Sequence, residues 1–302
     1  MTAACDFTRL GKVLVTGHRG FIGSHLFDTL VSNNVDVEGI DLRDGPGSDL
    51  TDKSVVEALG AFDTIFHLAA YNGTKHFYTK PFQVAYNNTL PTLNLVEKYS
   101  EDTVRFVFAS TCEIFNSYTN THPEAVPTRE DVPVMFTDIG NPRWSYSLPK
   151  ALGENLVLAN MKAPVVARFF NIYGPRQQDH FIDEFVRRGR DTGVWELYGN
   201  DTRSFCFISD AIDALIGLAN SQSAVGQIFN VGNDCETSID SVAKLIMKKM
   251  GVEENLLSIK DGRRGSAIRR SPDISKLGSM IGWEPRVELD EGLDKVLVGI
   301  IL

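Results

Sequence analysis

The sequence predicts an α/β fold built on a doubly wound parallel sheet, followed by a smaller α/β region. Short runs of apolar and β-branched residues, typical of strands buried on both faces, recur through residues 1–171. Segments with helical periodicity lie between these runs, which is the pattern of a parallel sheet covered by helices. A glycine triplet, G-x-x-G-x-x-G, also follows the first run where a strand turns into a helix.

The glycine triplet predicts a bound dinucleotide. The first strand, residues 13–16, is followed by Gly17, Gly20 and Gly23. Gly17 permits a tight turn, Gly20 lets backbone N–H groups approach a pyrophosphate, and Gly23 lets the helix pack on the strand. The diphosphate would lie at the helix N-terminus, where the helix dipole favours anions. The other residues of this loop that we expect at the cofactor are Phe21 and Ile22.

The second strand decides which dinucleotide is expected. Residues 35–40 end at Asp41, about 20 residues beyond the glycines, where a carboxylate accepts hydrogen bonds from the adenosine ribose. This favours NAD. Arg43 could hold the 2′-phosphate of NADP, but Asp41 would repel that group, so NADP is the lesser option. Asp49 and Leu50 either border the adenine or are a helix cap and a core leucine.

The next strand and helix supply further candidates for cofactor contacts. The strand over residues 62–68 runs into small residues, which let a cofactor come close to the strand end. A long helix is predicted over residues 78–99, and its asparagine either touches the cofactor or faces a neighbouring loop. The expected contacts from this part of the chain are Leu68, Ala69, Ala70 and Asn88.

Polar side chains gather after the strand over residues 104–109, where Thr111, Cys112 and Glu113 follow one another. Open α/β sheets bind ligands at the carboxyl ends of their strands. The irregular segment 116–141 is too long for a plain connector and is expected to form a loop over the site.

A tyrosine and a lysine are spaced four residues apart at the start of the next helix. Tyr146 and Lys150 therefore share one face of a helix that is predicted to run to about residue 161. Pro149 lies between them and is tolerated if it falls in the first turn. The alternative is an exposed helix face with no role in chemistry.

The composition argues against several classes of protein. The formal charge is −9, so no basic excess is available to bind nucleic acid. No apolar run reaches the length of a membrane span and the N-terminal residues lack the apolar stretch of a signal peptide, which predicts a cytoplasmic protein with no membrane partner. The four cysteines are scattered, which argues against a disulfide framework or a metal site. Arg263, Arg264, Arg269 and Arg270 form a local basic cluster that suits a small anionic ligand.

In their order and distances, the motifs resemble the extended short-chain dehydrogenase/reductase superfamily, and within it the nucleotide-sugar epimerase/dehydratase family. The motifs that support this resemblance span nearly the whole chain: TGHRGFIG, HLAA, STCE, YSLPK, RFFNIYGPR, GNDTRSFCFISD and DISKLGSMIGWEP. The resemblance implies a Rossmann-type NAD-binding domain over residues 1–171, to which 203–220 return, and a region over 172–302 that mainly binds a nucleoside-diphosphate sugar. It also implies a homodimer formed through the long helices after Lys75 and Tyr146.

The resemblance implies a role for each site residue. Tyr146 takes the proton of a sugar hydroxyl as hydride passes to the nicotinamide, Lys150 lowers the pKa of Tyr146 and binds the nicotinamide ribose, and Thr111 holds the same hydroxyl. A cation is needed because a phenol with a pKa near 10 is a poor base at neutral pH. The implied substrate contacts are Asn171, Arg203, Arg269 and Arg270.

The step after oxidation depends on the residues that follow Thr111. Glu113 resembles the glutamate of the 4,6-dehydratases and the uronate decarboxylases, whereas C4 epimerases usually have no carboxylate there. In the dehydratases this glutamate removes the proton next to the new ketone, and an adjacent acid, aspartate in the glucose type, protonates the departing hydroxyl. Cys112 holds the adjacent position and is either a weak acid or a small buried hydrophobe. The STCE string also resembles the tunicamycin-type hexosamine 5,6-dehydratase.

We therefore predict an NAD-dependent dehydratase with Glu113 as its base. The alternatives are a C4 epimerase, a uronate decarboxylase and, outside enzymes, an NAD-binding sensor without turnover. Two features depart from the family pattern. Phe115 and Asn116 replace the usual tyrosine and glycine, and the short segment between Asp41 and Asp49 predicts that the third strand of the sheet is missing or vestigial.

Overall fold

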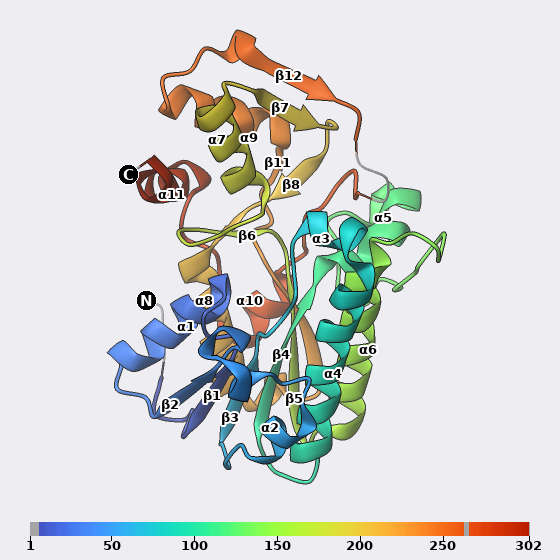
Figure 1. The fold of residues 1–302 in the computed structure, drawn as a ribbon, viewed down its shortest axis with the longest axis vertical. Helices are drawn as coiled ribbons and strands as arrows, with labels where there is room; N and C mark the ends of the chain where they lie inside the picture. The colour runs from blue at the N-terminus through green and yellow to red at the C-terminus, as the bar shows by residue number, and fades with distance from the viewer. Residues whose placement is uncertain (1–5, 263–265, 302) are drawn as a thin grey trace.

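The computed structural model describes residues 6–262 and 266–301. Its centre is a six-stranded parallel sheet with the strand order β10-β5-β4-β3-β1-β2 (Figure 1). The strands are β1 (Val13–Thr16), β2 (Val37–Ile40), β3 (Thr64–His67), β4 (Arg105–Thr111), β5 (Ala163–Phe169) and β10 (Gln227–Val231). The predicted parallel α/β sheet is confirmed.

Each face of the sheet has its own hydrophobic core. In β1, Val13 and Val15 point to one face and Leu14 to the other, because successive side chains of a strand alternate. The first face is covered by α1 (Phe21–Ser32), α8 (Ile208–Asn220) and α10 (Ser275–Ile281). The second is covered by α2 (Lys53–Glu57), α4 (Pro81–Tyr99) and α6 (Trp144–Asn160). Burial on both faces explains why the strands are almost wholly apolar.

The strand order creates a crevice beside β1. Strands β2 and β3 lie on opposite sides of β1, and such a reversal opens a ligand site at the carboxyl ends of the strands. Within the described ranges the sheet has no strand beyond β2. The connection instead forms two short 3-10 helices, Leu42–Asp44 and Pro46–Ser48, before α2. The predicted loss of the third strand is confirmed.

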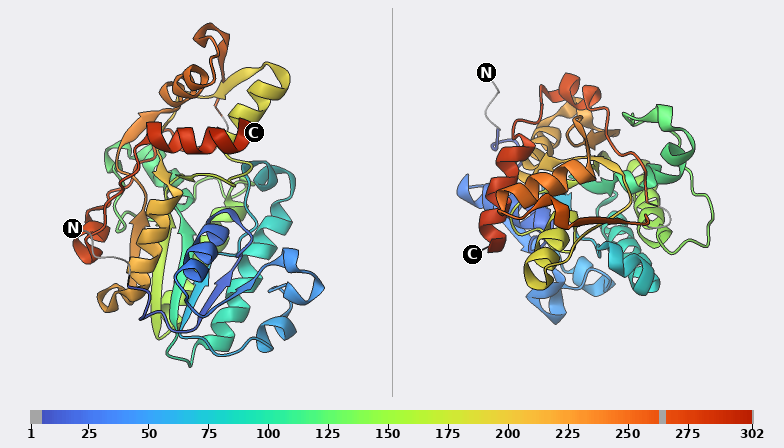
Figure 2. Two further views of the ribbon diagram at one scale, coloured as in Figure 1. Left: turned by 90° about the vertical axis from the view of Figure 1, so that its left-hand side faces the viewer. Right: turned by 90° about the horizontal axis from the view of Figure 1, so that it is seen from above.

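A smaller α/β region lies at the carboxyl edge of the sheet (Figures 1 and 2). A short parallel pair, β6 (Ile172–Tyr173) with β9 (Cys206–Phe207), leads into it. Its other elements are α7 (Phe181–Thr192), β7 (Trp195–Tyr198), β8 (Thr202–Ser204), β11 (Glu236–Ser238), α9 (Ile239–Lys249), β12 (Leu257–Lys260) and α11 (Leu289–Ile301). The chain passes back to the main sheet over α8 and β10, where α8 packs on α1 and β4 and β10 pairs with β5, and again at α10, which packs on β10. The predicted domain boundary at residue 171 places β10 in the smaller region, whereas β10 belongs to the main sheet.

Two helix boundaries differ from those predicted. The segment 78–99 belongs to two helices, α3 (Thr74–Thr79) and α4, and Pro81 opens α4, where its missing N–H costs no hydrogen bond. Helix α6 begins at Trp144, so Pro149 lies in its second turn rather than its first and removes one helical donor. Among the described helices, none is long and apolar enough to cross a membrane.

Candidate active site

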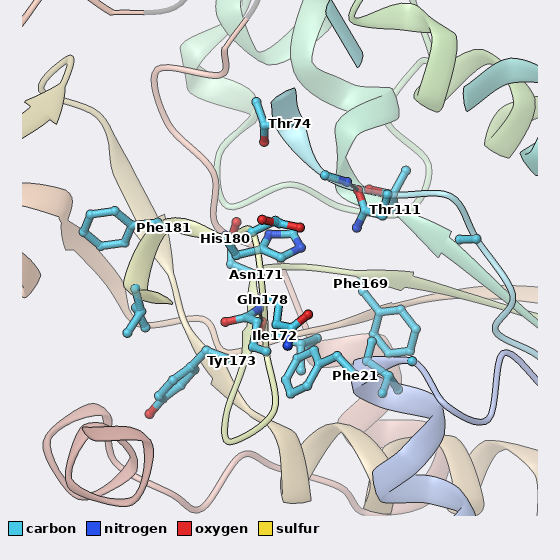
Figure 3. A pocket seen from close by; sticks show the side chains of 18 of the residues that line it. Phe21, Thr74, Thr111, Phe169, Asn171, Ile172, Tyr173, Gln178, His180 and Phe181 are labelled. Carbon is cyan, nitrogen blue, oxygen red and sulfur yellow. Dashed lines mark hydrogen bonds between the residues drawn. The ribbon is translucent and has the colours of Figure 1, made fainter. Parts of the chain in front are cut away.

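A cavity of about 1140 Å³ lies between the carboxyl edge of the sheet and the smaller region (Figure 3). Its walls are the glycine loop, the ends of β3, β4 and β5, the start of α6 and the segment that leads from β6 into α7. Pockets for single ligands measure about 300–1,000 Å³. This cavity is therefore large enough for a dinucleotide with a second ligand beside it.

The glycine loop forms a close-packed cradle at the N-terminus of α1. Gly17 has a φ of +73°, which favours glycine, and a Cβ there would lie 2.8 Å from the backbone of Ala69. A Cβ on Gly23 would lie 2.1 Å from the carbonyl oxygen of Gly17. The loop residues that line the cavity are Gly17, Gly20, Phe21, Ile22 and Gly23. This bare backbone at a helix N-terminus fits the pyrophosphate of a dinucleotide.

Asp41, at the end of β2, is paired with Arg43. The Nε and Nη2 atoms of Arg43 donate to the two carboxylate oxygens at 2.9 and 3.0 Å, and the backbone N–H of Arg19 donates at 3.2 Å. Burial alone would raise the pKa of Asp41, but the contacts with Arg43 outweigh it and hold the pKa below its usual range. Arg43 lines the cavity, and the ionised Asp41 beside it would repel a 2′-phosphate, which agrees with the preference for NAD.

Five predicted cofactor contacts do not line the cavity: Asp41, Asp49, Leu50, Ala69 and Asn88. The Asp49 carboxylate accepts hydrogen bonds from Thr51 within its own turn, and Leu50 is buried in the core beside α4. Asn88 hydrogen-bonds the backbone of Tyr71 and is buried. Leu50 is therefore the core leucine of the alternative interpretation. Asp49 is not the helix cap, because Asp52 caps α2 and Asp49 bonds only within its own turn. Of the residues after β3, Leu68 and Ala70 line the cavity and Ala69 lies against Gly17.

The tyrosine and the lysine predicted from their spacing meet the end of β4 inside the cavity. Thr111, Tyr146 and Lys150 all line it. The Tyr146 ring stacks on Phe77 with centroids 4.9 Å apart, which fixes its position. The Lys150 ammonium donates to the carbonyl of Ala109 at 2.8 Å. The structure thus brings the three residues together at one side of the cavity.

The electrostatics of the pair differ from the expectation. Burial and the negative charge of Glu113 raise the pKa of Tyr146 above its ordinary value. Burial lowers the pKa of Lys150 to about 8, against the opposing charge of Glu154. In the protein alone the Lys150 ammonium is directed at the carbonyl of Ala109, and burial has the largest influence on the pKa of Tyr146. The predicted activation of the tyrosine depends on what the bound cofactor and substrate add.

Glu113 is the centre of a buried ion cluster. Its Oε1 accepts hydrogen bonds from Arg143 Nη2 at 2.7 Å and Arg270 Nη2 at 2.8 Å. Its Oε2 accepts from Arg143 Nε at 2.8 Å and Asn116 Nδ2 at 2.7 Å. Burial alone would raise the pKa of Glu113, but the two guanidinium charges outweigh it and hold the pKa far below its usual range. A carboxylate has about four lone-pair positions, so all of them are in use.

The cluster has an excess of positive charge. Two guanidinium groups face one carboxylate, and Arg143 and Arg270 are 5% and 9% exposed. The Nε of Arg270 is buried without a hydrogen-bond partner in the described part of the chain. Buried charge of this kind is costly unless it is paired, so the site is suited to an anionic ligand.

Only one of the two adjacent arginines faces the cavity. Backbone hydrogen bonds join Thr202 to Ile268 and Ser204 to Arg270, so this segment is extended and successive side chains point to opposite sides. Arg270 lines the cavity, whereas Arg269 forms an ion pair with Glu236 at 2.6 Å on the other side. Of the two arginines expected at the substrate, Arg269 or Arg270, only Arg270 lines the cavity, and the expectation for Arg269 is corrected. Arg263 and Arg264 lie outside the described residues.

The other predicted substrate contacts line the cavity, as does Cys112. Asn171 has a φ of +39°, a region that asparagine tolerates, and its amide donates to the carbonyl of Ser204 at 3.0 Å. Arg203 pairs with Asp201 at 3.0 Å, and burial lowers its pKa to about 10. Burial raises the pKa of the Cys112 thiol, so it is neutral at pH 7. Cys112 is also part of a small apolar cluster, so both interpretations of it stand.

Two charged or ionisable cavity residues that were not predicted from the sequence, Arg143 and His180, bear on the chemistry of the site. Arg143 precedes Tyr146 by three residues, which places it one helical turn away, and that spacing could have indicated it. His180 lies at the end of the segment before α7, and no pattern in the sequence distinguishes it.

The model of the NAD dependent epimerase/dehydratase family matches residues 13–232. The chain belongs to this family. The family is NAD dependent, and the glycine cradle described above fits that cofactor. The family identifies this chain as an NAD-dependent enzyme of nucleotide-sugar metabolism and confirms the Rossmann-type fold.

Three relatives show how far similarity reaches within the family. A UDP-N-acetyl-alpha-D-glucosaminuronate decarboxylase of Bacillus cytotoxicus is 31% identical over 95% of this chain and 96% of its own. A UDP-glucose 4-epimerase of Mycolicibacterium smegmatis is also 31% identical, over 95% and 97%. The structure of MoeE5 in complex with UDP-glucuronic acid and NAD has a TM-score of 0.83 and 27% identity, covering 96% of this chain and 98% of MoeE5. A decarboxylase and an epimerase are thus equally similar, so identity alone does not separate the reactions.

Proposed function

We propose that this enzyme oxidises a nucleoside-diphosphate hexuronate and then releases the sugar carboxylate as carbon dioxide. The observation that supports this choice is the state of Glu113, whose oxygens each accept two hydrogen bonds from Arg143, Arg270 and Asn116. A carboxylate so occupied is a poor proton acceptor, but it orients two arginines toward an anion. A UDP-hexuronate is favoured because a decarboxylase and a complex with UDP-glucuronic acid are among the similar proteins.

The oxidation uses the residues at the end of β4 and the start of α6. Bound NAD supplies the hydride acceptor. Tyr146 removes the proton of the sugar hydroxyl, Thr111 holds that hydroxyl, and Lys150 supplies positive charge and binds the nicotinamide ribose. All three line the cavity, which supports these roles.

The second step does not require a base to remove a proton from a carbon of the sugar. Oxidation at C4 makes the sugar a β-keto acid, in which the bond from C5 to the carboxylate can break while its electron pair moves into the ketone as an enolate. Carbon dioxide leaves, C5 takes up a proton, and the ketone is reduced again to close the cycle. Arg143 and Arg270 supply the positive charge that suits both the carboxylate and the enolate.

Dehydration is the second candidate, favoured by the position of Glu113 two residues beyond Thr111 in the same cavity. It requires Glu113 to leave at least one of its four hydrogen bonds and accept a proton. It also requires an acid for the departing hydroxyl, and the neutral thiol of Cys112 is weaker than the aspartate of the glucose-type dehydratases. Both requirements make it the lesser candidate.

Product mass separates the reactions. The purified enzyme is incubated with NAD and, in parallel, with UDP-glucuronate, UDP-N-acetylglucosamine and UDP-glucose. We expect a product from UDP-glucuronate that is lighter by one carbon dioxide. A product lighter by one water would establish dehydration, and a rearranged product of unchanged mass would establish epimerisation; either result would overturn the proposal.

The variant Glu113→Gln tests the role of the ion cluster. We expect carbon dioxide release to fall by at least about a hundredfold, because an amide cannot pair with two guanidinium groups as a carboxylate does. Reduction of bound NAD should survive, since the loss of a negative charge near Tyr146 favours its ionisation. Glu124→Gln, on an exposed position outside the cavity, is the matched control. Full product formation by the Glu113 variant would refute the assigned role.

The proposal includes a homodimer formed through α4 and α6. Helix α4 exposes Phe82, Tyr86 and Leu93, and the adjacent helix α6 exposes Leu152. Phe82 is 72% exposed, which is unfavourable for a phenylalanine in a monomer. Sedimentation at the mass of two chains is expected, and a monomer would contradict this part of the proposal.

A further inference from the structure

His180 is a cavity residue with no assigned partner. It is the last residue before α7, and its backbone carbonyl accepts the first helical hydrogen bond from Glu184 at 2.8 Å. Its imidazole is half-buried, lines the cavity and makes no hydrogen bond or ion pair with any residue that the structure describes. Figure 3 shows the ring beside Asn171, turned toward the side of the cavity that holds Thr111. The ring therefore faces the space where the substrate binds.

Charged groups of both signs surround this ring. Asp179 precedes it, Asp183 lies on the first turn of α7, Glu113 lies beyond β4, and Arg270 lies on the segment beside β8. Burial lowers the pKa of His180, Arg270 acts in the same direction, and the three carboxylates oppose them. The net result is a pKa below the ordinary value of 6.5, so the imidazole is neutral at pH 7 without a ligand.

A second observation indicates that an anion binds beside this ring. Arg270 is 9% exposed, lines the same cavity, and its Nε is buried without a hydrogen-bond partner in the described ranges. Asn171 and Arg203 line the cavity as well. Nη2 of Arg270 stays on Glu113, on the side of the sugar, while its Nε, together with Arg203 and Asn171, is available to the diphosphate of a nucleoside-diphosphate sugar. That diphosphate would bring negative charge close to His180.

We propose that His180 binds the substrate diphosphate as an imidazolium and takes up its proton from solvent when the substrate binds. The imidazole nitrogen gains a proton and then donates a charge-assisted hydrogen bond to a phosphate oxygen. The inference depends on nucleotide-sugar binding and holds whichever reaction follows. It makes His180 a residue that links substrate affinity to pH.

The direction in which affinity changes with pH follows from the pKa of His180 in the free enzyme and in the complex. An anion within about 4–6 Å favours the charged imidazole, so its pKa is higher in the complex than in the free enzyme. Affinity is greatest below the lower of the two pKa values and falls as pH rises through the interval between them. The expected decrease is about tenfold for each unit of pKa that binding adds.

UDP-glucose is the probe, because its diphosphate has no group that titrates near neutral pH. The NAD-loaded enzyme is mixed with UDP-glucose at pH 7 in weak buffer, and proton uptake is followed with an indicator dye. The dissociation constant is measured across the neutral range of pH in the same preparation. We expect uptake of up to one proton per site and a tenfold or greater loss of affinity toward high pH.

Two variants test whether His180 is responsible for the proton uptake and for the pH dependence of affinity. His180→Gln keeps a polar side chain that cannot ionise, and it should bind UDP-glucose with no proton uptake and a flat pH profile. His122→Gln is the matched control, because His122 stacks on Tyr118 outside the cavity lining, and it should behave as the wild type. Absence of uptake in the wild type, or equal uptake in His180→Gln, would overturn the inference. These binding measurements do not depend on which product forms, so the proposed decarboxylation can fail separately.

Discussion

Replacing Tyr146 with phenylalanine is expected to slow the reduction of bound NAD by about 10²–10⁴-fold, the range that a positioned general base supplies. The variant loses the phenol oxygen and keeps the ring, so the stack on Phe77, with centroids 4.9 Å apart, remains in place. Substrate binding and folding should therefore change little. The rise in NADH absorbance during the first turnover with UDP-glucuronate measures the effect.

The pH dependence of that first turnover provides a second readout. In the protein alone the pKa of Tyr146 is above its ordinary value, so at saturating substrate the wild-type rate should rise with pH as more of the phenol ionises. The Tyr146→Phe variant should lose this dependence. Tyr118→Phe, which alters a tyrosine that stacks on His122 outside the cavity lining, should leave both rate and profile unchanged. A Tyr146→Phe variant that reduces NAD at the wild-type rate would exclude this residue as the base.

The features that could be predicted from the sequence are those that depend on residues close together in the chain. The glycine loop needs close approaches between residues near in the chain, as between Gly17 and Gly23, and the pattern of glycines records them directly. Tyr146 and Lys150 share a helix face because four residues make about one turn. The alternation of strands and helices likewise fixed the parallel sheet. Each of these depends on backbone geometry within one or two elements.

The ion cluster could not be predicted, because it joins distant segments. Glu113 and Arg270 are 157 residues apart in the chain, and only the packing of the smaller region against the sheet brings them to 2.8 Å. The sequence left Arg269 and Arg270 equivalent, and the register of an extended segment distinguishes them. The prediction that Glu113 acts as a base has the same cause, because the arginines that occupy its oxygens come from distant segments of the chain. A glutamate at a strand end gives no indication of how many donors will surround it.

A second buried ion pair, between Arg168 and Glu154, lies next to the site, and breaking it should have the largest effect on stability. Arg168 on β5 and Glu154 on α6 form two hydrogen bonds, at 2.7 and 2.9 Å, and their side chains are 4% and 7% exposed. Arg168→Met would leave the carboxylate buried without its partner, which costs about 3–5 kcal/mol of unfolding free energy. Urea unfolding followed by circular dichroism measures the loss. Arg129→Met is the matched control, because its ion pair with Asp131 is exposed and should contribute less than about 1 kcal/mol.

The double variant Arg168→Met with Glu154→Leu separates pairing from packing. If the loss in the single variant comes from an unpaired buried charge, the second substitution removes that charge and should restore much of the stability. The chemistry should not return with it, because Ser110 donates a hydrogen bond to Glu154 and directly precedes Thr111. Glu154 also lies one turn beyond Lys150, whose pKa its charge helps to keep as high as about 8. A stable double variant with slow oxidation would show that this ion pair positions the active site. Restored stability with the wild-type rate would show that it serves the fold alone.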